Sequence, residues 1–289
     1  MDIVSKKTER KNNQIFKDNI IDNTIEGNFK DNQISKTINL KFDPNKISYL
    51  NDLTVDSYSE HYSVNKFSVF KSYNNIFYLV YSTKNKSIIF HDLINNKKIS
   101  DIKNAHSNNI SYLLHFFDEI NKKEYILSCS YEDNNLKLWD LNNLENLLCL
   151  ININSQGGLR SASILKDNGQ NYIITSNCQY LDEISDPLKV YDFKGNKVKE
   201  IEDSNETTFF IDSFYDNKSF INYIITGNID CAKSYIFNQN KLYHKYFNTK
   251  KENHSVKIDN SEEIIKLIVA RGDGYIRIWD FHSGILIKA

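Results

Sequence analysis

A six-residue run that recurs five times along the chain limits the folds that this sequence can adopt. Its copies are Ser87–Asp92, Asn135–Asp140, Pro187–Asp192, Lys233–Asn238 and Tyr275–Asp280. Their last residues, at 92, 140, 192, 238 and 280, lie 48, 52, 46 and 42 positions apart. A period of ~20–50 residues indicates a fold built from repeated units, each of which buries its apolar face against the next.

The residues within each run alternate between apolar and polar. Leu136 and Leu138 in the second copy show the pattern, which Ser234 interrupts in the fourth. A period of two is expected of a strand with one buried face. The chain offers no comparable run of apolar residues at helical spacing, and its apolar stretches are rich in β-branched and aromatic residues, which favour strands.

Three further strands are predicted around each run. A second apolar stretch precedes it, such as Tyr125–Cys129, and a third lies further upstream, such as Ile110–Phe117. A weaker strand follows, such as Lys98–Ile102. Four strands per unit, joined by short turns and repeated every ~40–45 residues, are typical of a propeller blade. We therefore expect an all-β propeller with about five recognisable four-stranded blades.

The second and fifth units share additional residues in the same order. His106 precedes the strand pair that ends at Trp139, and His254 precedes the pair that ends at Trp279. In both units an aspartate stands six positions before the tryptophan, and another directly follows it. This order resembles the WD40 repeat over about residues 62–289. The other units depart from it, because their residues at the tryptophan position are His91, Tyr191 and Phe237.

The resemblance implies a buried polar network inside a blade. In that network the histidine lies between the turn aspartate and a strand hydroxyl, and the hydroxyl meets the tryptophan indole. A buried indole N–H needs an acceptor, which gives the arrangement a physical reason. The implied members are, in the second unit, His106, Asp133, Trp139 and either Ser128 or Ser130 and, in the fifth, His254, Asp273 and Trp279, without an obvious hydroxyl.

A histidine, an aspartate and a serine at one site also invite a hydrolase interpretation. We favour the structural role, because the group recurs with the repeat. The sequence contains no Gly-x-Ser-x-Gly elbow, P-loop or HExxH motif. Its cysteines form no CxxC pair, which argues against a metal site. We therefore predict no catalytic residue, no metal and no cofactor.

Charge and hydropathy limit the partners. The chain has 36 basic and 37 acidic residues, so no excess of positive charge favours nucleic acid or an anionic lipid surface. No run approaches the ~18 apolar residues of a membrane-spanning helix. The first residues, Met1–Asn13, lack the apolar stretch of a signal peptide. We expect a cytoplasmic protein that is not inserted in a membrane.

The two ends differ from the repeats. Residues 1–60 are predicted to be an arm rich in Asn and Lys or a degenerate blade, and residues 61–289 to hold the blades. The segment Ile285–Ala289 begins the outer strand of the fifth blade. Since WD40 propellers most often have seven blades, we expect either an incomplete arc of a seven-bladed propeller or a propeller closed with help from the N-terminal region. The arc could be completed by missing C-terminal blades, by the N-terminal region or by another chain.

The functional expectation is a non-catalytic scaffold that binds proteins or peptides through its inter-blade loops. The segments Gln156–Ser161 and Asn177–Asp186 are the loops singled out, and the residues predicted to contact a partner are Gln156, Arg160, Tyr180 and Asp182. Two alternatives remain open at this stage. One is an enzyme or small-ligand site at the propeller channel, because a fold does not determine function. The other is a truncated, non-functional duplicate.

Overall fold

A computed structural model describes residues 64–152, 158–178, 186–247 and 253–289. The chain divides into two units, Met1–Val55 and Asp56–Ala289, and all described residues belong to the second. The arm or degenerate blade predicted for residues 1–60 lies outside the described residues. Within the described residues, no helix is long and apolar enough to span a membrane.

The described residues form five antiparallel four-stranded sheets and no helix. Each sheet is called a blade below. The first three are β1 (Val64–Lys71), β2 (Phe77–Thr83), β3 (Ile88–Asp92), β4 (Lys97–Ile102); β5 (Ile110–Asp118), β6 (Lys123–Ser130), β7 (Asn135–Asp140), β8 (Asn143–Asn152); and β9 (Gly158–Asp167), β10 (Gln170–Cys178), β11 (Lys189–Asp192), β12 (Lys197–Glu200). The last two are β13 (Thr208–Asp216), β14 (Ile221–Asn228), β15 (Cys231–Ile236), β16 (Lys241–Phe247); and β17 (Asn253–Asp259), β18 (Lys266–Arg271), β19 (Ile276–Asp280), β20 (Leu286–Lys288). This confirms the predicted all-β fold of five blades.

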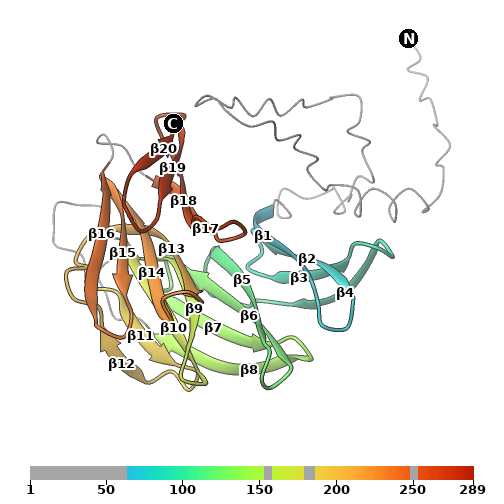
Figure 1. The fold of residues 1–289 in the computed structure, drawn as a ribbon. Coiled ribbons are helices and arrows are strands. Elements are labelled where there is room, and N and C mark those ends of the chain that lie inside the picture. Colours follow the sequence, from blue (N-terminus) through green and yellow to red (C-terminus); the bar gives the residue numbers. More distant parts are fainter. Residues whose placement is uncertain (1–63, 153–157, 179–185, 248–252) are drawn as a thin grey trace, which may run out of the picture. The chain divides into compact units, whose positions relative to one another are not determined.

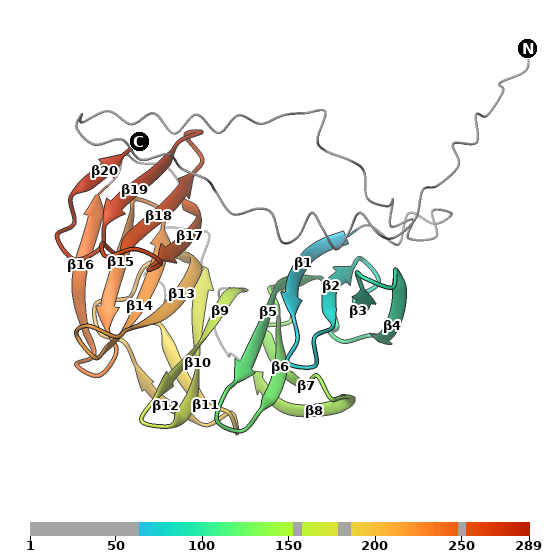
Figure 2. The ribbon, with the colours of Figure 1, turned by 45° about the vertical axis from the view of Figure 1, so that its right-hand side comes forward.

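The blades follow one another in chain order, and the first strand of each is the innermost (Figures 1 and 2). Four buried apolar clusters join consecutive blades, and burying one large apolar side chain contributes roughly 1.5–3 kcal/mol. None of these clusters, which cover the described residues only, combines the first blade with the fifth. Representative pairs are Phe90 with Trp139, Leu138 with Ile164, Val190 with Tyr235, and Tyr223 with Phe281.

Polar contacts also link neighbouring blades at corresponding positions. Asp118, at the end of β5, accepts a hydrogen bond of 2.9 Å from Asn171 Nδ2 in β10. Asp167, at the end of β9, accepts one of 2.8 Å from Asn222 Nδ2 in β14. Burial alone would raise the pKa of Asp118, but hydrogen bonds from its neighbours, including Asn171, bring that pKa well below its usual value. These two contacts link each blade to the next at corresponding positions.

The strand pairing corrects one alignment made from the sequence. The first residue of β6 is Lys123 and that of β14 is Ile221. Ile126 and Ile224 each lie three residues after these starting points and are therefore equivalent. Ile126 pairs with Trp139, and Ile224 pairs with Tyr235. The counterpart of Trp139 in the fourth blade is therefore Tyr235, and the placement of Phe237 was wrong. Asn238 had been matched to the aspartate that ends the other runs, which moved the alignment by two residues.

Candidate binding cleft on the innermost strands

Each innermost strand carries an irregularity near its start. Pairing is interrupted by one extra residue between Val64 and Lys66 in β1, between Ile110 and Tyr112 in β5, and between Thr208 and Phe210 in β13; the pair β17–β18 shows the same interruption. In β9–β10, two residues of β9, Arg160 and Ser161, stand against one residue of β10. A bulge of this kind leaves one residue out of the ladder and turns its side chain in a new direction. In β5 and β13 the extra residues are Ser111 and Phe209.

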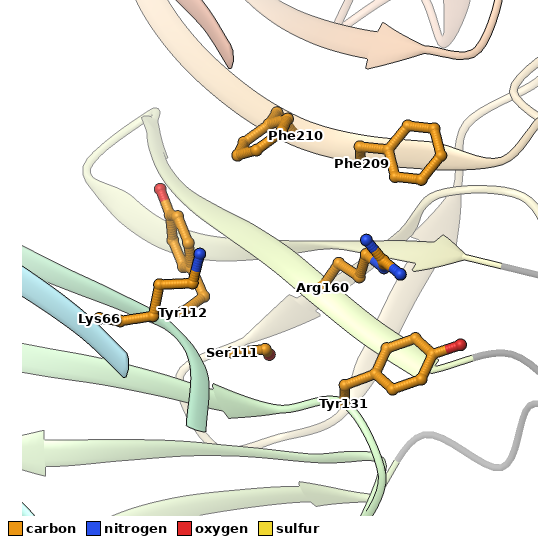
Figure 3. Close-up of a pocket in the computed structure, with 7 residues that line it drawn as sticks. All are labelled: Lys66, Ser111, Tyr112, Tyr131, Arg160, Phe209 and Phe210. Atoms are coloured by element: carbon orange, nitrogen blue, oxygen red, sulfur yellow. The ribbon is translucent and has the colours of Figure 1, made fainter. Parts of the chain in front are cut away.

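These bulges build a cleft with a volume of about 260 Å³ (Figure 3). Three of its residues, Ser111, Arg160 and Phe209, lie within the interruptions of β5, β9 and β13. The complete described lining, drawn from the first four blades, is Lys66, Ser111, Tyr112, Tyr131, Arg160, Phe209 and Phe210.

Arg160 lies between two aromatic rings of the cleft. Its guanidinium carbon is 5.1 Å from the ring centre of Tyr131 and 5.3 Å from that of Phe209. Figure 3 shows this group on one side, with Lys66 and Tyr112 on the other. A cation over a ring face gains roughly 0.5–2 kcal/mol, depending on desolvation. The rings therefore fix the plane of the guanidinium.

The position of Tyr131 depends on a glycine at the start of β9. A Cβ atom at Gly158 would lie 2.1 Å from Cδ2 and Cε2 of the Tyr131 ring, which is closer than any real carbon contact. Any side chain at position 158 would displace the ring, and with it one of the two faces that hold Arg160. The absence of a side chain at Gly158 therefore leaves the space that the Tyr131 ring occupies.

Among the described lining residues, the charged ones are Lys66 and Arg160. Burial, with a further contribution from the Asp212 carboxylate, raises the pKa of Tyr112 to about 12. The Tyr112 phenol is therefore protonated at neutral pH. Asp212 itself forms an ion pair of 3.0 Å with Lys257 Nζ.

The described residues of the cleft do not form a nucleophile–base pair. Ser111 Oγ lies 2.9 Å from the Leu159 carbonyl and 3.2 Å from the Cys129 carbonyl, and donates to them rather than to an acid or a base. The described lining contains no histidine, cysteine or carboxylate. Among the described residues, no group of three or more histidine, cysteine and acidic side chains could hold a metal. The arrangement suits binding by rings, hydroxyls and cations.

The structure brings together the polar group of the second blade. Trp139 Nε1 donates to Ser128 Oγ over 2.9 Å. The same oxygen lies 2.8 Å from His106 Nε2, and His106 Nδ1 lies 3.3 Å from Asp133 Oδ2. Of the two candidate hydroxyls, Ser128 is the one at the network. Burial lowers the pKa of His106 to about 4, against the opposite effect of Asp133, so the ring is neutral at pH 7.

The fifth blade lacks the corresponding hydroxyl. Val269 pairs with Arg277, as Ser128 pairs with Lys137, so a valine side chain faces the tryptophan. Trp279 Nε1 is buried and has no acceptor. Asp273 Oδ2 accepts a hydrogen bond of 2.8 Å from Arg277 Nη1. The side chain of His254 lies outside the described residues.

The predicted partner contacts are only partly described. Arg160 lines the cleft, whereas the other three, Gln156, Tyr180 and Asp182, lie outside the described residues. Sequence reasoning missed the remaining lining residues, because no motif marks them. One signal was available: Lys66, Tyr112 and Phe210 each stand directly after the bulge of an innermost strand. Aligning the repeats by their first strands would have placed these three together.

No protein-family model matches the chain, and comparison with curated proteins gives no match. Neither comparison transfers an activity or a partner to this chain. Its function is therefore inferred from the fold and the cleft themselves.

Proposed function

We propose that this chain is a non-catalytic protein-interaction module of the WD40-repeat type. In this proposal the cleft on the innermost strands receives side chains of a protein partner. The observation that carries it is the composition of the cleft, in which Arg160 stacks between Tyr131 and Phe209. Tyrosine and arginine, together with other aromatic residues, are enriched where protein interfaces concentrate their binding energy.

The size of the cleft supports a side-chain ligand. Its volume of about 260 Å³ lies below the ~300–1,000 Å³ of pockets that enclose a drug-sized molecule. One or two side chains of a partner would fill it, while the surrounding strand ends and loops would contact the partner's backbone. A protein-binding surface with a central anchoring site has this form.

The innermost strands are tied together around the cleft. Ser163 Oγ and Ser213 Oγ, in β9 and β13, lie 2.8 Å apart. Ile211 N in β13 donates to Ser161 Oγ in β9 over 3.2 Å. Such cross-links hold the cleft in one shape, and a preformed site loses less conformational entropy on binding.

A photo-crosslinking experiment tests this function. A benzophenone amino acid replaces Phe210 in the cleft or, as the control, Val198 on the outermost strand β12, where the side chain is 50 % exposed. After irradiation in an extract of the cells that make the protein, position 210 should capture a defined partner and position 198 should not. The partner is then purified, and its affinity for the full chain is measured.

A matched pair of variants completes the test. Tyr131→Ala should weaken binding of the purified partner by about 10-fold or more, as expected for an interface anchor, whereas Val198→Ala should leave the affinity unchanged. Equal capture at both positions, or equal affinity of the Tyr131→Ala variant, would contradict a binding role for the cleft. Detection of catalytic turnover that depends on the cleft residues would overturn the non-catalytic assignment.

A further inference from the structure

We infer that the outer edge of β8, in the second blade, is a docking site for a second copy of this chain. In the resulting dimer the two β8 strands pair antiparallel, edge to edge. This surface is separate from the cleft, because no residue of β8 belongs to the described lining. Dimerisation is therefore independent of the proposed binding function.

The main chain of β8 is paired on one side. The strand is last in the order β5-β6-β7-β8 and pairs with β7 (Figure 1). Among the described residues, no strand pairs with its other side. An edge strand presents a row of N–H and C=O groups to which a further strand can bind. The outer edge of β8 can therefore accept an added strand.

The regular part of β8 is long for an outermost strand of this protein. In all five blades, pairing of the last two strands is interrupted near the position equivalent to Trp139. Beyond that interruption, regular pairing covers residues 149–152 in β8 and 244–247 in β16, but only residues 199–200 in β12. Since the interruption is common to all blades, it does not protect β8 more than the other edges.

One position of this edge lacks the charge that other blades have there. Leu150 pairs with Lys137 in the second blade. The residues at the equivalent position of the first, third and fourth blades are charged: Asp101, Glu200 and Lys245. Charged side chains on an edge strand oppose its pairing with another chain. Leu150 is apolar and 46 % exposed, so β8 lacks this protection.

The side chains around Leu150 are also apolar. Leu147 and Leu148 are both exposed. The strand contains one charged residue, Glu145, and no lysine or proline, whereas β4, β12, β16 and β20 each contain lysine. Lysine and proline are among the residues that block strand edges in natural proteins. A strand added along residues 147–152 would cover exposed leucines without burying a charge.

The second copy supplies a matching strand through its own β8. An added strand must be uncharged where it meets Leu150, since a charge there would lose water without gaining a partner. Of the five outermost strands that the structure describes, β8 is the one whose regular edge carries no charge. Two identical edges related by a twofold axis pair antiparallel, and this contact closes the assembly as a dimer.

Sedimentation equilibrium of the full chain over a concentration series tests the inference. We expect a monomer–dimer equilibrium with a dissociation constant of roughly 10–100 µM, because one strand pair is a small interface. Amide hydrogen exchange of residues 147–152 should slow as the dimer forms, since pairing protects N–H groups from solvent. A monomer throughout the series, or a dimer in which this exchange is unchanged, would overturn the inference.

Three variants distinguish this edge from other surfaces. Leu150→Lys introduces the residue type that the fourth blade has at this position and should weaken dimerisation by at least about 10-fold. Leu150→Val keeps an apolar side chain that suits a strand and should dimerise like the original chain. Glu200→Lys places the same cation at the equivalent position of the third blade and should have no effect. Thermal unfolding of each variant confirms that it is folded.

Two further results would count against a second copy. One is equal dimerisation of the Leu150→Lys and Glu200→Lys variants, which would place the contact elsewhere on the chain. The other is a chain that stays monomeric but binds an extended peptide of another protein along β8. The Tyr131→Ala variant, which tests the cleft, should dimerise normally, so that failure of either proposal leaves the other standing.

Discussion

The second and fifth blades carry the same spacing of aspartate and tryptophan but differ inside. Around Trp139, a chain of hydrogen bonds runs through Ser128 and His106 to Asp133. Around Trp279, the indole N–H is buried without an acceptor. Both tryptophans pair with the neighbouring strand in the same way, so the backbone does not cause the difference. The difference comes from Val269, which occupies the position of Ser128 in the second blade.

This contrast separates two roles of the tryptophan. In the second blade the ring both packs against the first blade and anchors a polar network. In the fifth it belongs only to the apolar cluster shared with the fourth blade. A buried donor without a partner costs roughly 1–3 kcal/mol. The fifth blade therefore keeps its tryptophan for packing, although the polar half of the motif is incomplete.

The largest expected effect comes from giving the second blade the valine that the fifth blade has at the position of Ser128. Ser128→Val removes the acceptor of Trp139 and the donor to His106, so we expect a loss of about 3 kcal/mol of stability. Urea unfolding gives the total, and amide hydrogen exchange localises it to β6 and β7. Ser128→Thr retains a hydroxyl and serves as the control. A loss below about 1 kcal/mol would mean that the network contributes little.

The second-largest expected effect is a loss of unfolding free energy on acidification, caused by protonation of His106 in the second blade. The pKa of His106 is about 4 in the folded chain and ~6.5 when unfolded, so the unfolded state binds more protons between these values. Stability therefore falls as pH decreases through this window, by about 2 kcal/mol from pH 7 to pH 5. The measurement is the pH dependence of urea unfolding.

The reference for this pH dependence is His106→Gln, which cannot titrate there. Burial also lowers the pKa of His115, so part of the slope should persist in the variant. The difference between the two slopes isolates His106, whose neighbours Asp133 and Lys137 have opposite effects on its pKa. Identical slopes would show that His106 is equally easy to protonate in the folded and unfolded chains.

A smaller effect should appear when each tryptophan is separately replaced by phenylalanine, which removes the indole N–H and part of the ring. Trp139→Phe and Trp279→Phe create similar losses of packing, but only the first breaks a hydrogen bond. We expect Trp139→Phe to cost about 1 kcal/mol more than Trp279→Phe. Thermal unfolding of the two variants side by side measures this difference. Equal costs would argue that the bond from Trp139 to Ser128 has no net value.

The smallest expected effect comes from completing the fifth blade. Val269→Thr keeps the shape of the side chain and supplies an acceptor for Trp279 Nε1, so stability should rise by up to about 1 kcal/mol. Slower amide exchange in β18 and β19 would localise the gain. Val269→Ala, which shortens the side chain without adding a hydroxyl, should instead destabilise. A loss with Thr comparable to that with Ala would show that the hydroxyl does not reach the indole.

The network of the second blade was largely predictable because its members lie at fixed offsets within one repeat. The resemblance to the WD40 repeat implied His106, Asp133 and Trp139, and left only Ser128 and Ser130 for the hydroxyl. The fourth blade was harder, because Asn238 imitated the end of the repeat and moved the alignment by two residues. Pairing between β14 and β15 gives the register that places Tyr235 opposite Ile224.

The cleft was mostly hidden from the sequence. Arg160 was singled out as a contact residue, but its neighbours were not, since they come from four blades and are far apart along the chain. The directions of the Ser111 and Phe209 side chains are set by bulges, and these bulges form only when each strand pairs with the next. Steric space at Gly158 for Tyr131 likewise exists only once β9 lies beside the end of β6.

The amino-acid sequence by itself determined the repeated unit, with its period and its alternating strands, and the resemblance of the second unit to the WD40 repeat implied the residues of its network. Those features are local, because strand periodicity and the spacing within a repeat do not require distant contacts. Only the tertiary structure decided that Ser128 is the hydroxyl, that Trp279 has no acceptor and that an aromatic cleft lies on the innermost strands. Each of these depends on which side chains face one another across strands and blades, and that is set by register, bulges and stacking.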